Sequence, residues 1–495
     1  MHAPSPIARY AERAFALDVR SLAALRMGLG AILLADLATR ASDFAAMYTE
    51  AGVAPLAVVR AERDPGQWSV YLASGASWFQ AAMFLVAAAL AVALLVGYRT
   101  RLATIGSWAM LVSLHVRLPV VLNAGDTMLR VLLFWSMLLP LGAVWSLDAR
   151  RRGPPRAMRA VSAATLGCMV QLSLVYWLAG WAKLNEQWLT GDALANVLGF
   201  GLYTSALGRR LLEFPELTRW LGRSVIWFEL IAPCLLFVPW AAARLRLLLF
   251  AAMVAFHAGI AATVTVGLFS YVAIVAWLAI LPSEFWERFR WTAIRTVDGN
   301  APIPLASSPR GGWLTTAVCA AALALVCYWN AMVLAGPLGL RPVHATLVRA
   351  ANALGLRQSW GLFGHPPEQD SWFVYQARLA SGERIDLLTG APAAEYDKPP
   401  LASRQFPNHR WRKLHWRARH ASAKQYRLPL VDYFGRRWNE AHDADRQVVR
   451  LDLYCYSQGL GGGAPEDQQM RELLAQKVFA ESGGNFAEAI RDLDP

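Results

Sequence analysis

A lysine stands at the end of a long apolar run. Lys183 lies in YWLAGWAKLNEQWLTGDAL, residues 176–194. An ammonium group beside a membrane span costs free energy unless it reaches water, finds a partner or loses its proton. On a helix, Tyr176, Gly180 and Lys183 share one face, which predicts a notch for a flat ring one turn before the amine. A desolvated amine there would be a general base.

The alternative readings of this segment are structural. A lysine at a helix end commonly extends its amine to the lipid headgroups. Trp181 and the tryptophans near it in sequence are also typical of the aromatic belt at a membrane surface. Under these readings the segment anchors a helix and does no chemistry.

Other polar groups interrupt the apolar segments. His115, Glu229 and His257 fall inside predicted spans, and Asn123 and Asp126 belong to the loop that follows His115. With the topology given below, all of them lie toward the outer side of the membrane, as Lys183 does. This predicts one outward-facing polar cavity, although a lone intramembrane histidine more often bonds a neighbouring helix than a ligand.

The composition is that of an integral membrane protein. The 495 residues are 56% hydrophobic and 17% charged, with a mean hydropathy of +0.31. Apolar stretches long enough to cross the bilayer number about nine. The predicted fold class is therefore an α-helical polytopic membrane bundle with a C-terminal soluble domain. The predicted spans lie near 21–40, 77–97, 102–121, 127–147, 160–183, 224–241, 245–265, 267–282 and 313–335.

Basic residues orient these spans. Short cytoplasmic loops retain Lys and Arg, which predicts a cytoplasmic N-terminus and a C-terminal domain outside the cell inner or plasma membrane. The more basic set of alternate loops contains Arg9, Arg13, Arg20, Arg99, Arg101, Arg150, Arg151, Arg152, Arg156, Arg159, Arg244, Arg246, Arg288, Arg290, Arg295 and Arg310.

The amino-acid composition changes after residue 340, so we predict a transmembrane domain over 1–340 and an extracytoplasmic, partly β domain over 341–495. Residues 372–388 form two strand-like runs around Ser381 and Gly382, and 448–456 alternate at period two. Residues 464–482, after the break at 461–463, are predicted to be helical. None of the five cysteines has metal-ligand spacing, so no metal site is predicted.

Residues 404–427 are strongly basic. This stretch contains RWRKLHWRAR and has no Asp or Glu. Basic residues interleaved with Trp411 and Trp416 resemble a nucleic-acid surface in composition, but the predicted outside location excludes nucleic acid as a partner. Two readings remain open: contact with anionic headgroups or an acidic polypeptide, and a solvated basic face.

The Lys183 segment resembles a motif of a known family. AGWAKLNEQWLTGDAL is similar to Ala-Gly-x-Lys-Lys-Leu-Asp-x-x-Trp-x-x-Gly of the vitamin K-dependent γ-carboxylases and their bacterial relatives, the horizontally transferred transmembrane (HTTM) domain proteins. Five further segments resemble HTTM segments: DVRSLAALRMGLG (18–30), NAGD (123–126), FELIAP (228–233), LFSYVAIVAWLAILP (268–282) and QSWGLFGHPP (358–367).

The resemblance implies quinol chemistry on the outer side of the membrane. In the carboxylases a lysine of the motif deprotonates vitamin K hydroquinone, O2 adds, and a glutamate is deprotonated and carboxylated by CO2. That lysine corresponds to Lys183, and a histidine that stabilises the chemistry corresponds to His115 by a looser alignment. The sequence departs from the motif at Ala182, where the first lysine is missing, and at Asn185, where the motif has Asp.

The leading hypothesis is a membrane enzyme that uses reduced vitamin K or menaquinol, with Lys183 and His115 as catalytic residues. Epoxidation would be coupled to carboxylation or proton abstraction on an outward-facing peptide or small-molecule substrate. Residues predicted to bind substrate or cofactor are Tyr176, Gly180, Trp181, Asn123, Asp126, Glu229 and His257. The alternative is a non-catalytic membrane protein that binds a lipid or quinone and recruits a partner through its C-terminal domain.

Overall fold

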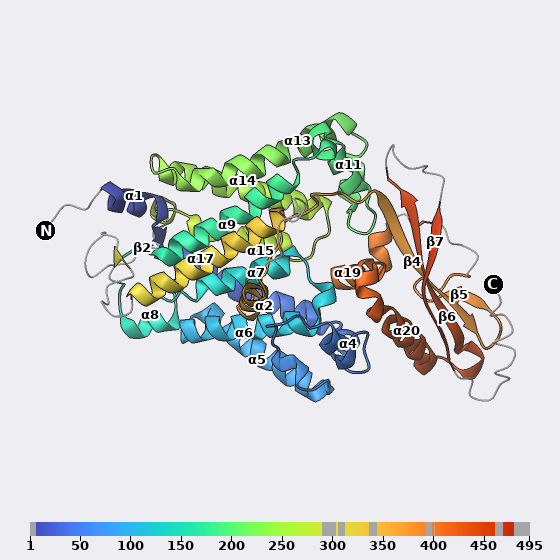
Figure 1. The fold of residues 1–495 in the computed structure, drawn as a ribbon. Helices are drawn as coiled ribbons and strands as arrows, with labels where there is room; N and C mark the ends of the chain where they lie inside the picture. The colour runs from blue at the N-terminus through green and yellow to red at the C-terminus, as the bar shows by residue number, and fades with distance from the viewer. Residues whose placement is uncertain are drawn as a thin grey trace.

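The computed structural model describes residues 6–155, 157–289, 303–304, 312–335, 344–392, 398–399, 401–460 and 469–479. Figure 1 shows a bundle of helices with a β-sheet at one end. The first described helix, α1 (Pro6–Phe15), lies at the opposite end of the bundle from this sheet. The molecule is therefore elongated, with a helical body and a β-sheet cap.

Six helices among the described residues are long and apolar enough to cross a membrane, so the chain is a multi-pass membrane protein. In α13 the apolar segment continues through the 3-10 turn η3 (Ala232–Phe237). Each of these helices overlaps a predicted span, although α13 begins nine residues before the predicted span 224–241. They are α2 (Val19–Ala41), α5 (Ser77–Val96), α9 (Ala163–Ala182), α13 (Pro215–Ile231), α14 (Ala242–Thr263) and α17 (Gly312–Ala335).

The other three predicted spans fall on helices that are not both long and apolar enough to cross a membrane, so nine spans are not confirmed. One helix has 18 residues with polar and basic positions, and the second ends at Ser136, before Pro140. The third gives way to the 3-10 turn η4 (Leu278–Ile280) before Pro282. These helices are α6 (Thr100–Arg117), α7 (Ala124–Ser136) and α15 (Phe269–Trp277).

Short elements connect the long helices. At the end near the N-terminus, β1 (Leu17–Asp18) pairs antiparallel with β2 (Arg159–Val161), which pairs parallel with β3 (Ile303–Pro304). Eight further short helices in the described part of the chain flank or connect the long helices. They are α1 (Pro6–Phe15), α3 (Phe44–Tyr48), α4 (Leu56–Ala61), α8 (Leu147–Arg152), α10 (Glu186–Thr190), α11 (Asp192–Gly199), α12 (Ala206–Leu211) and α16 (Ser283–Trp286).

The C-terminal sheet is antiparallel, with the strand order β5-β4-β6-β7. The hairpin predicted around 381–382 is confirmed by β4 (Gln369–Leu379) and β5 (Arg384–Asp386), and the strand predicted at 448–456 by β6 (Val448–Gly459). The helix predicted over 464–482 is wrong, because β7 (Met470–Val478) pairs with β6. Residues 464–468 and 480–482 of that prediction lie outside the described residues.

Helices join the sheet to the bundle. Three helices of this region are α18 (Ala345–Ala353), α19 (His409–Ala418) and α20 (Arg427–Ala441). One continuous hydrophobic cluster contains Leu37 and Leu118 from the membrane part, Leu414 from α19, and Tyr375 and Leu453 from the sheet. The sheet and the bundle therefore share a core across residue 340.

The basic stretch 404–427 is not a solvated face. Arg410 and Arg412 of α19 are buried against the bundle. The Asp36 carboxylate of α2 accepts from Arg410 at 2.5 Å and from Arg40 at 2.7 Å, and Arg40 also reaches Asp126 at 2.6 Å. These two carboxylates and two guanidinium groups form a buried charge network in which each charge has a partner.

Candidate functional site

Lys183 is the residue at which α9 ends. Its backbone N–H donates to the Gly180 carbonyl, which turns the chain away from the helix axis at the boundary of the apolar run. The side chain is buried, and its ammonium donates to Oε2 of Glu229 at 2.8 Å and to the Ala179 carbonyl at 3.2 Å. It also lies 5.3 Å from the centre of the Trp188 ring. Lys183 therefore has a carboxylate partner and does not extend to solvent.

The Lys183–Glu229 pair lines a cavity of about 1370 Å³ between the bundle and the sheet domain. The cavity is larger than the roughly 300–1000 Å³ of typical drug-sized ligand sites, so it has room for an elongated ligand or for two molecules. Its apolar walls come from several helices. They include Val175, Val197, Val225, Phe256, Ile260, Val264, Val266 and Phe269.

A directed hydrogen-bond chain lies in the same wall. The indole N–H of Trp277 donates to the Tyr176 hydroxyl at 2.7 Å, and this hydroxyl lies 2.7 Å from Nε2 of His257. Because the tyrosine oxygen already accepts from the indole, its own proton points to Nε2, and a neutral His257 carries its proton on Nδ1. This Nδ1 is buried and has no hydrogen-bond partner among the described residues.

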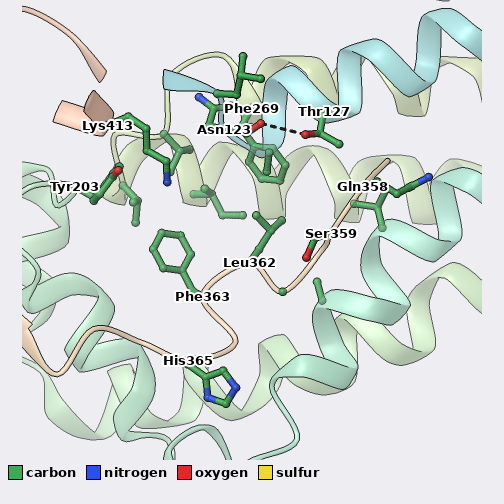
Figure 2. A pocket seen from close by; sticks show the side chains of 18 of the residues that line it. Asn123, Thr127, Tyr203, Phe269, Gln358, Ser359, Leu362, Phe363, His365 and Lys413 are labelled. Atoms are coloured by element: carbon green, nitrogen blue, oxygen red, sulfur yellow. Dashed lines mark hydrogen bonds between the residues drawn. The ribbon is translucent and has the colours of Figure 1, made fainter. Parts of the chain in front are cut away.

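The loop 358–367 closes over the lysine motif. The Asn185 amide donates to the Gly364 carbonyl at 2.8 Å, and the Trp188 indole donates to the Phe363 carbonyl at 2.8 Å. In Figure 2 the side chains of Leu362 and Phe363 reach into the cavity from this loop. The lysine motif therefore holds the loop in place through its asparagine and tryptophan.

The family model of the HTTM domain matches residues 16–286, more than half of the chain. The chain belongs to the HTTM domain family. The matched part contains Lys183, Glu229, Tyr176 and His257, whereas loop 358–367 lies beyond it. No curated protein and no solved structure matches the chain.

This HTTM protein brings several of the predicted site residues together. Lys183, Tyr176, Glu229, His257 and Asn123 all line the one cavity. The Lys183–Glu229 contact was missed at the sequence level, because 46 residues separate the two partners. The membership of both residues in family-like segments, AGWAKL and FELIAP, was the signal that could have paired them.

His115 and Asp126 do not line this cavity. His115 is buried behind its wall, with Nδ1 3.4 Å from an Arg130 nitrogen and Nε2 3.6 Å from the Asp126 carboxylate. Asp126 accepts from the Asn123 backbone N–H and from Arg40, so it caps α7 and joins the charge network. Both residues therefore support the site from behind.

Gly180 and Trp181 also lie away from the cavity. A Cβ at Gly180 would come within 2.9 Å of Leu230 and 3.2 Å of Glu229, so α13 already fills the predicted notch. Trp181 is 59% exposed on the outside of the bundle, as expected of a residue that faces lipid. The small residue serves close helix packing, which brings Glu229 to the lysine.

The wall opposite the lysine motif is basic. Lys413, Arg417 and His409 of α19 line the cavity together with Tyr203, and Figure 2 labels the Lys413 and Tyr203 side chains in this lining. Burial, reinforced by the charge of Arg417, lowers the pKa of Lys413 to about 8. Burial likewise lowers the pKa of His409 to about 4, so His409 is neutral at pH 7. Sequence reasoning placed none of these residues in the site.

The described residues contain no group of three His, Cys, Asp or Glu side chains that could hold a metal ion. The five cysteines are free thiols. The chemistry available to this cavity is that of one buried ammonium–carboxylate pair, oriented hydroxyl and imidazole groups, and a basic wall.

Proposed function

We propose that this HTTM protein is a quinol-dependent membrane enzyme that binds reduced vitamin K or menaquinol in the cavity. The observation that carries the proposal is the buried Lys183–Glu229 pair on the wall of a large, mainly apolar cavity. O2 and CO2 are the proposed co-substrates. The proposed acceptor is a peptide or small molecule that approaches from the outer side.

The residues of the cavity fit an isoprenoid quinol. A flat aromatic head with an alkyl tail needs apolar walls and a few polar groups at its oxygens. Phe256, Ile260 and Phe269 supply such walls, and the orphaned buried Nδ1–H of His257 is a donor in need of an acceptor. Reduced quinone would supply the reducing equivalents for epoxidation coupled to carboxylation or to another proton abstraction.

The chain's own contribution is to hold and move one proton. Desolvation of a buried ion pair offsets much of the Coulombic attraction between its two charges. A proton that passes from Lys183 Nζ to Glu229 Oε2 over 2.8 Å leaves a free amine on the cavity wall. The carboxylate thus makes the amine available as a base, a role that Lys183 alone would fill poorly.

We also propose the orientation of the molecule. Figure 1 places α1, α8 and β2 at the end of the bundle opposite the sheet. These elements and their loops carry many of the arginines of the more basic set of alternate loops, including Arg150, Arg151 and Arg152 of α8. The positive-inside rule then favours a cytoplasmic N-terminus in the inner or plasma membrane and an outward sheet domain and cavity.

The test is a turnover assay on the purified full-length protein. The protein is incubated with reduced menaquinone or reduced vitamin K, O2 and labelled bicarbonate, with candidate acceptor peptides added. We expect epoxide formation from wild type, and its loss in Lys183→Met and Glu229→Gln. Lys424→Met, which removes an exposed lysine away from the cavity, is the matched control and should retain wild-type turnover.

The same assay separates the enzyme from the non-catalytic alternative. If the protein binds menaquinone but produces neither epoxide nor fixed label, and Lys183→Met changes only ligand affinity, the lipid- or quinone-binding function holds. If epoxide forms without fixed label, the quinol chemistry stands and the acceptor is another proton donor.

A further inference from the structure

The basic wall of the cavity has unused hydrogen-bonding capacity. Lys413 forms no hydrogen bond and no ion pair with any described residue. The buried Tyr203 hydroxyl likewise has no partner in the described part of the chain. A buried hydroxyl without a partner costs free energy, and the half-buried Lys413 side chain on the same cavity wall offers further unused donors. Both groups therefore point to an acceptor that the protein itself does not supply.

Arg417 adds a second cation beside Lys413. The two residues are four positions apart on α19 and therefore share a helix face. The Arg417 guanidinium donates to the carbonyls of Pro119 at 2.8 Å and Leu122 at 3.1 Å, and it pairs with no carboxylate among the described residues. These neutral acceptors orient the guanidinium, and the carboxylates of Asp126 and Glu62 act on its charge without forming an ion pair with it.

The carboxylates of the cavity are engaged elsewhere. Glu229 pairs with Lys183, and Asp64 pairs with Arg357. Asp126 raises the pKa of Lys413 through its charge, but it is not on the cavity wall and already bonds Arg40. Glu368, the other carboxylate of the lining, is exposed. The α19 wall therefore carries an excess of positive charge.

We propose that Tyr203, Lys413 and Arg417 form a binding subsite for the phosphate monoester head of an amphiphile. A phosphate monoester carries about two negative charges near neutral pH, which matches two cations, whereas one carboxylate would leave a cation unpaired. The Tyr203 hydroxyl would donate to a third oxygen. The apolar walls beyond the subsite, including Val264 and Val266, would hold the hydrocarbon part.

This inference concerns the same cavity as the proposed function but is independent of the redox reaction. Binding is measured without quinol and without O2, so loss of anion binding and loss of epoxide formation are separate results. A cavity of about 1370 Å³ accommodates such a head group together with a second molecule at the lysine end.

The experiment measures binding to the full-length protein in detergent by isothermal titration calorimetry. The probes are dioctanoyl phosphatidic acid, inorganic phosphate and succinate. We expect Lys413→Gln to weaken binding of phosphatidic acid about tenfold or more, and Tyr203→Phe about fivefold. Lys413→Arg should bind within about threefold of wild type because it keeps the charge. Lys424→Gln, on the exposed surface, is the matched control.

The outcomes are distinct. Lys413-dependent binding of phosphatidic acid alone supports a membrane amphiphile, and Lys413-dependent binding of inorganic phosphate as well supports a soluble phosphate monoester. Succinate binding as tight as phosphate binding would overturn the phosphate assignment. The subsite would be overturned if Lys413→Gln and Lys424→Gln lost equal affinity for phosphatidic acid. It would also be overturned if a wild-type protein that unfolds cooperatively bound none of the probes. A thermal unfolding midpoint within a few degrees of wild type shows that each variant is folded.

Discussion

Glu229→Gln gives the sharpest test of the lysine's environment. The substitution keeps the shape of the side chain but leaves the Lys183 ammonium buried without a carboxylate. Removal of one partner of a buried ion pair costs about 3–5 kcal/mol. The side chains of the pair are only 4% and 7% exposed, so solvent screens this interaction little. Because Lys183 retains its contacts with the Ala179 carbonyl and the Trp188 ring, we expect a loss of stability at the lower end of this range, about 3 kcal/mol.

The double variant supplies the internal control. Lys183→Met combined with Glu229→Gln removes both charges, and replacement of a whole buried pair by groups of similar volume is close to neutral. We therefore expect each single variant to lose about 3 kcal/mol and the double variant to lie within about 1 kcal/mol of wild type. The resulting coupling energy is about 5 kcal/mol or more, which is large for a single pair.

Reversible unfolding of the detergent-solubilised protein, followed by circular dichroism, measures these free energies. The reasoning fails if the stability losses of the two single variants sum to within about 0.5 kcal/mol of the loss in the double variant, since substitutions at independent sites are additive. Turnover provides a second readout. All three variants should lack epoxide formation, including the double variant whose stability is restored.

Two further predictions concern the cavity walls. Gly364→Ala would place a Cβ 2.8 Å from the Ala182 Cβ and 3.0 Å from the Ala182 carbonyl oxygen. We expect the free energy of unfolding to fall by about 1–3 kcal/mol in the same assay. An unchanged unfolding midpoint would show that the loop does not pack there. The affinity for phosphatidic acid should fall as the pH rises through about 8, because Lys413 is charged below its pKa and neutral above it. Lys413→Arg should retain its affinity up to pH 9, and a wild-type affinity that stays constant from pH 7 to 9 would refute the role of the ammonium.

The helical body was predictable because its signal is local. A membrane span of about 20 apolar residues is recognisable in the sequence, and α2, α5 and α9 match their predicted ranges within a few residues. The shorter α7 shows the limit of this signal. Its apolar composition continues past Ser136, but the backbone leaves the helix before Pro140, which cannot supply an N–H to a continuing helix.

The wrong helix at 464–482 has a tertiary cause. Met470–Val478, MRELLAQKV, is rich in residues that favour helices, including Glu, Leu and Ala. The strand instead pairs with β6 through a register that joins Leu453 to Ala475. A strand on the edge of a sheet is determined by its neighbour more than by its own propensity.

The site was predictable in part. The residues on the apolar helices, Lys183, Tyr176 and His257, were identified because a polar group in an apolar run stands out. Lys413 and Tyr203 were missed because a lysine in a basic stretch and a tyrosine in a loop carry no such signal. Their significance arises only when α19 packs against the bundle, and no local pattern encodes that contact.

The bridge between Asp36 and Arg410 has a consequence for the order in which the protein is assembled. Asp36 enters the membrane with α2, among the first residues made, and its second arginine partner is synthesised 374 positions later. Until then Asp36, Arg40 and Asp126 carry a net charge of minus one in a site that is buried in the finished molecule. A chain that stops at residue 340 lacks the compensating guanidinium and the α19 wall of the cavity. Completion of the membrane site therefore depends on synthesis of the last third of the chain.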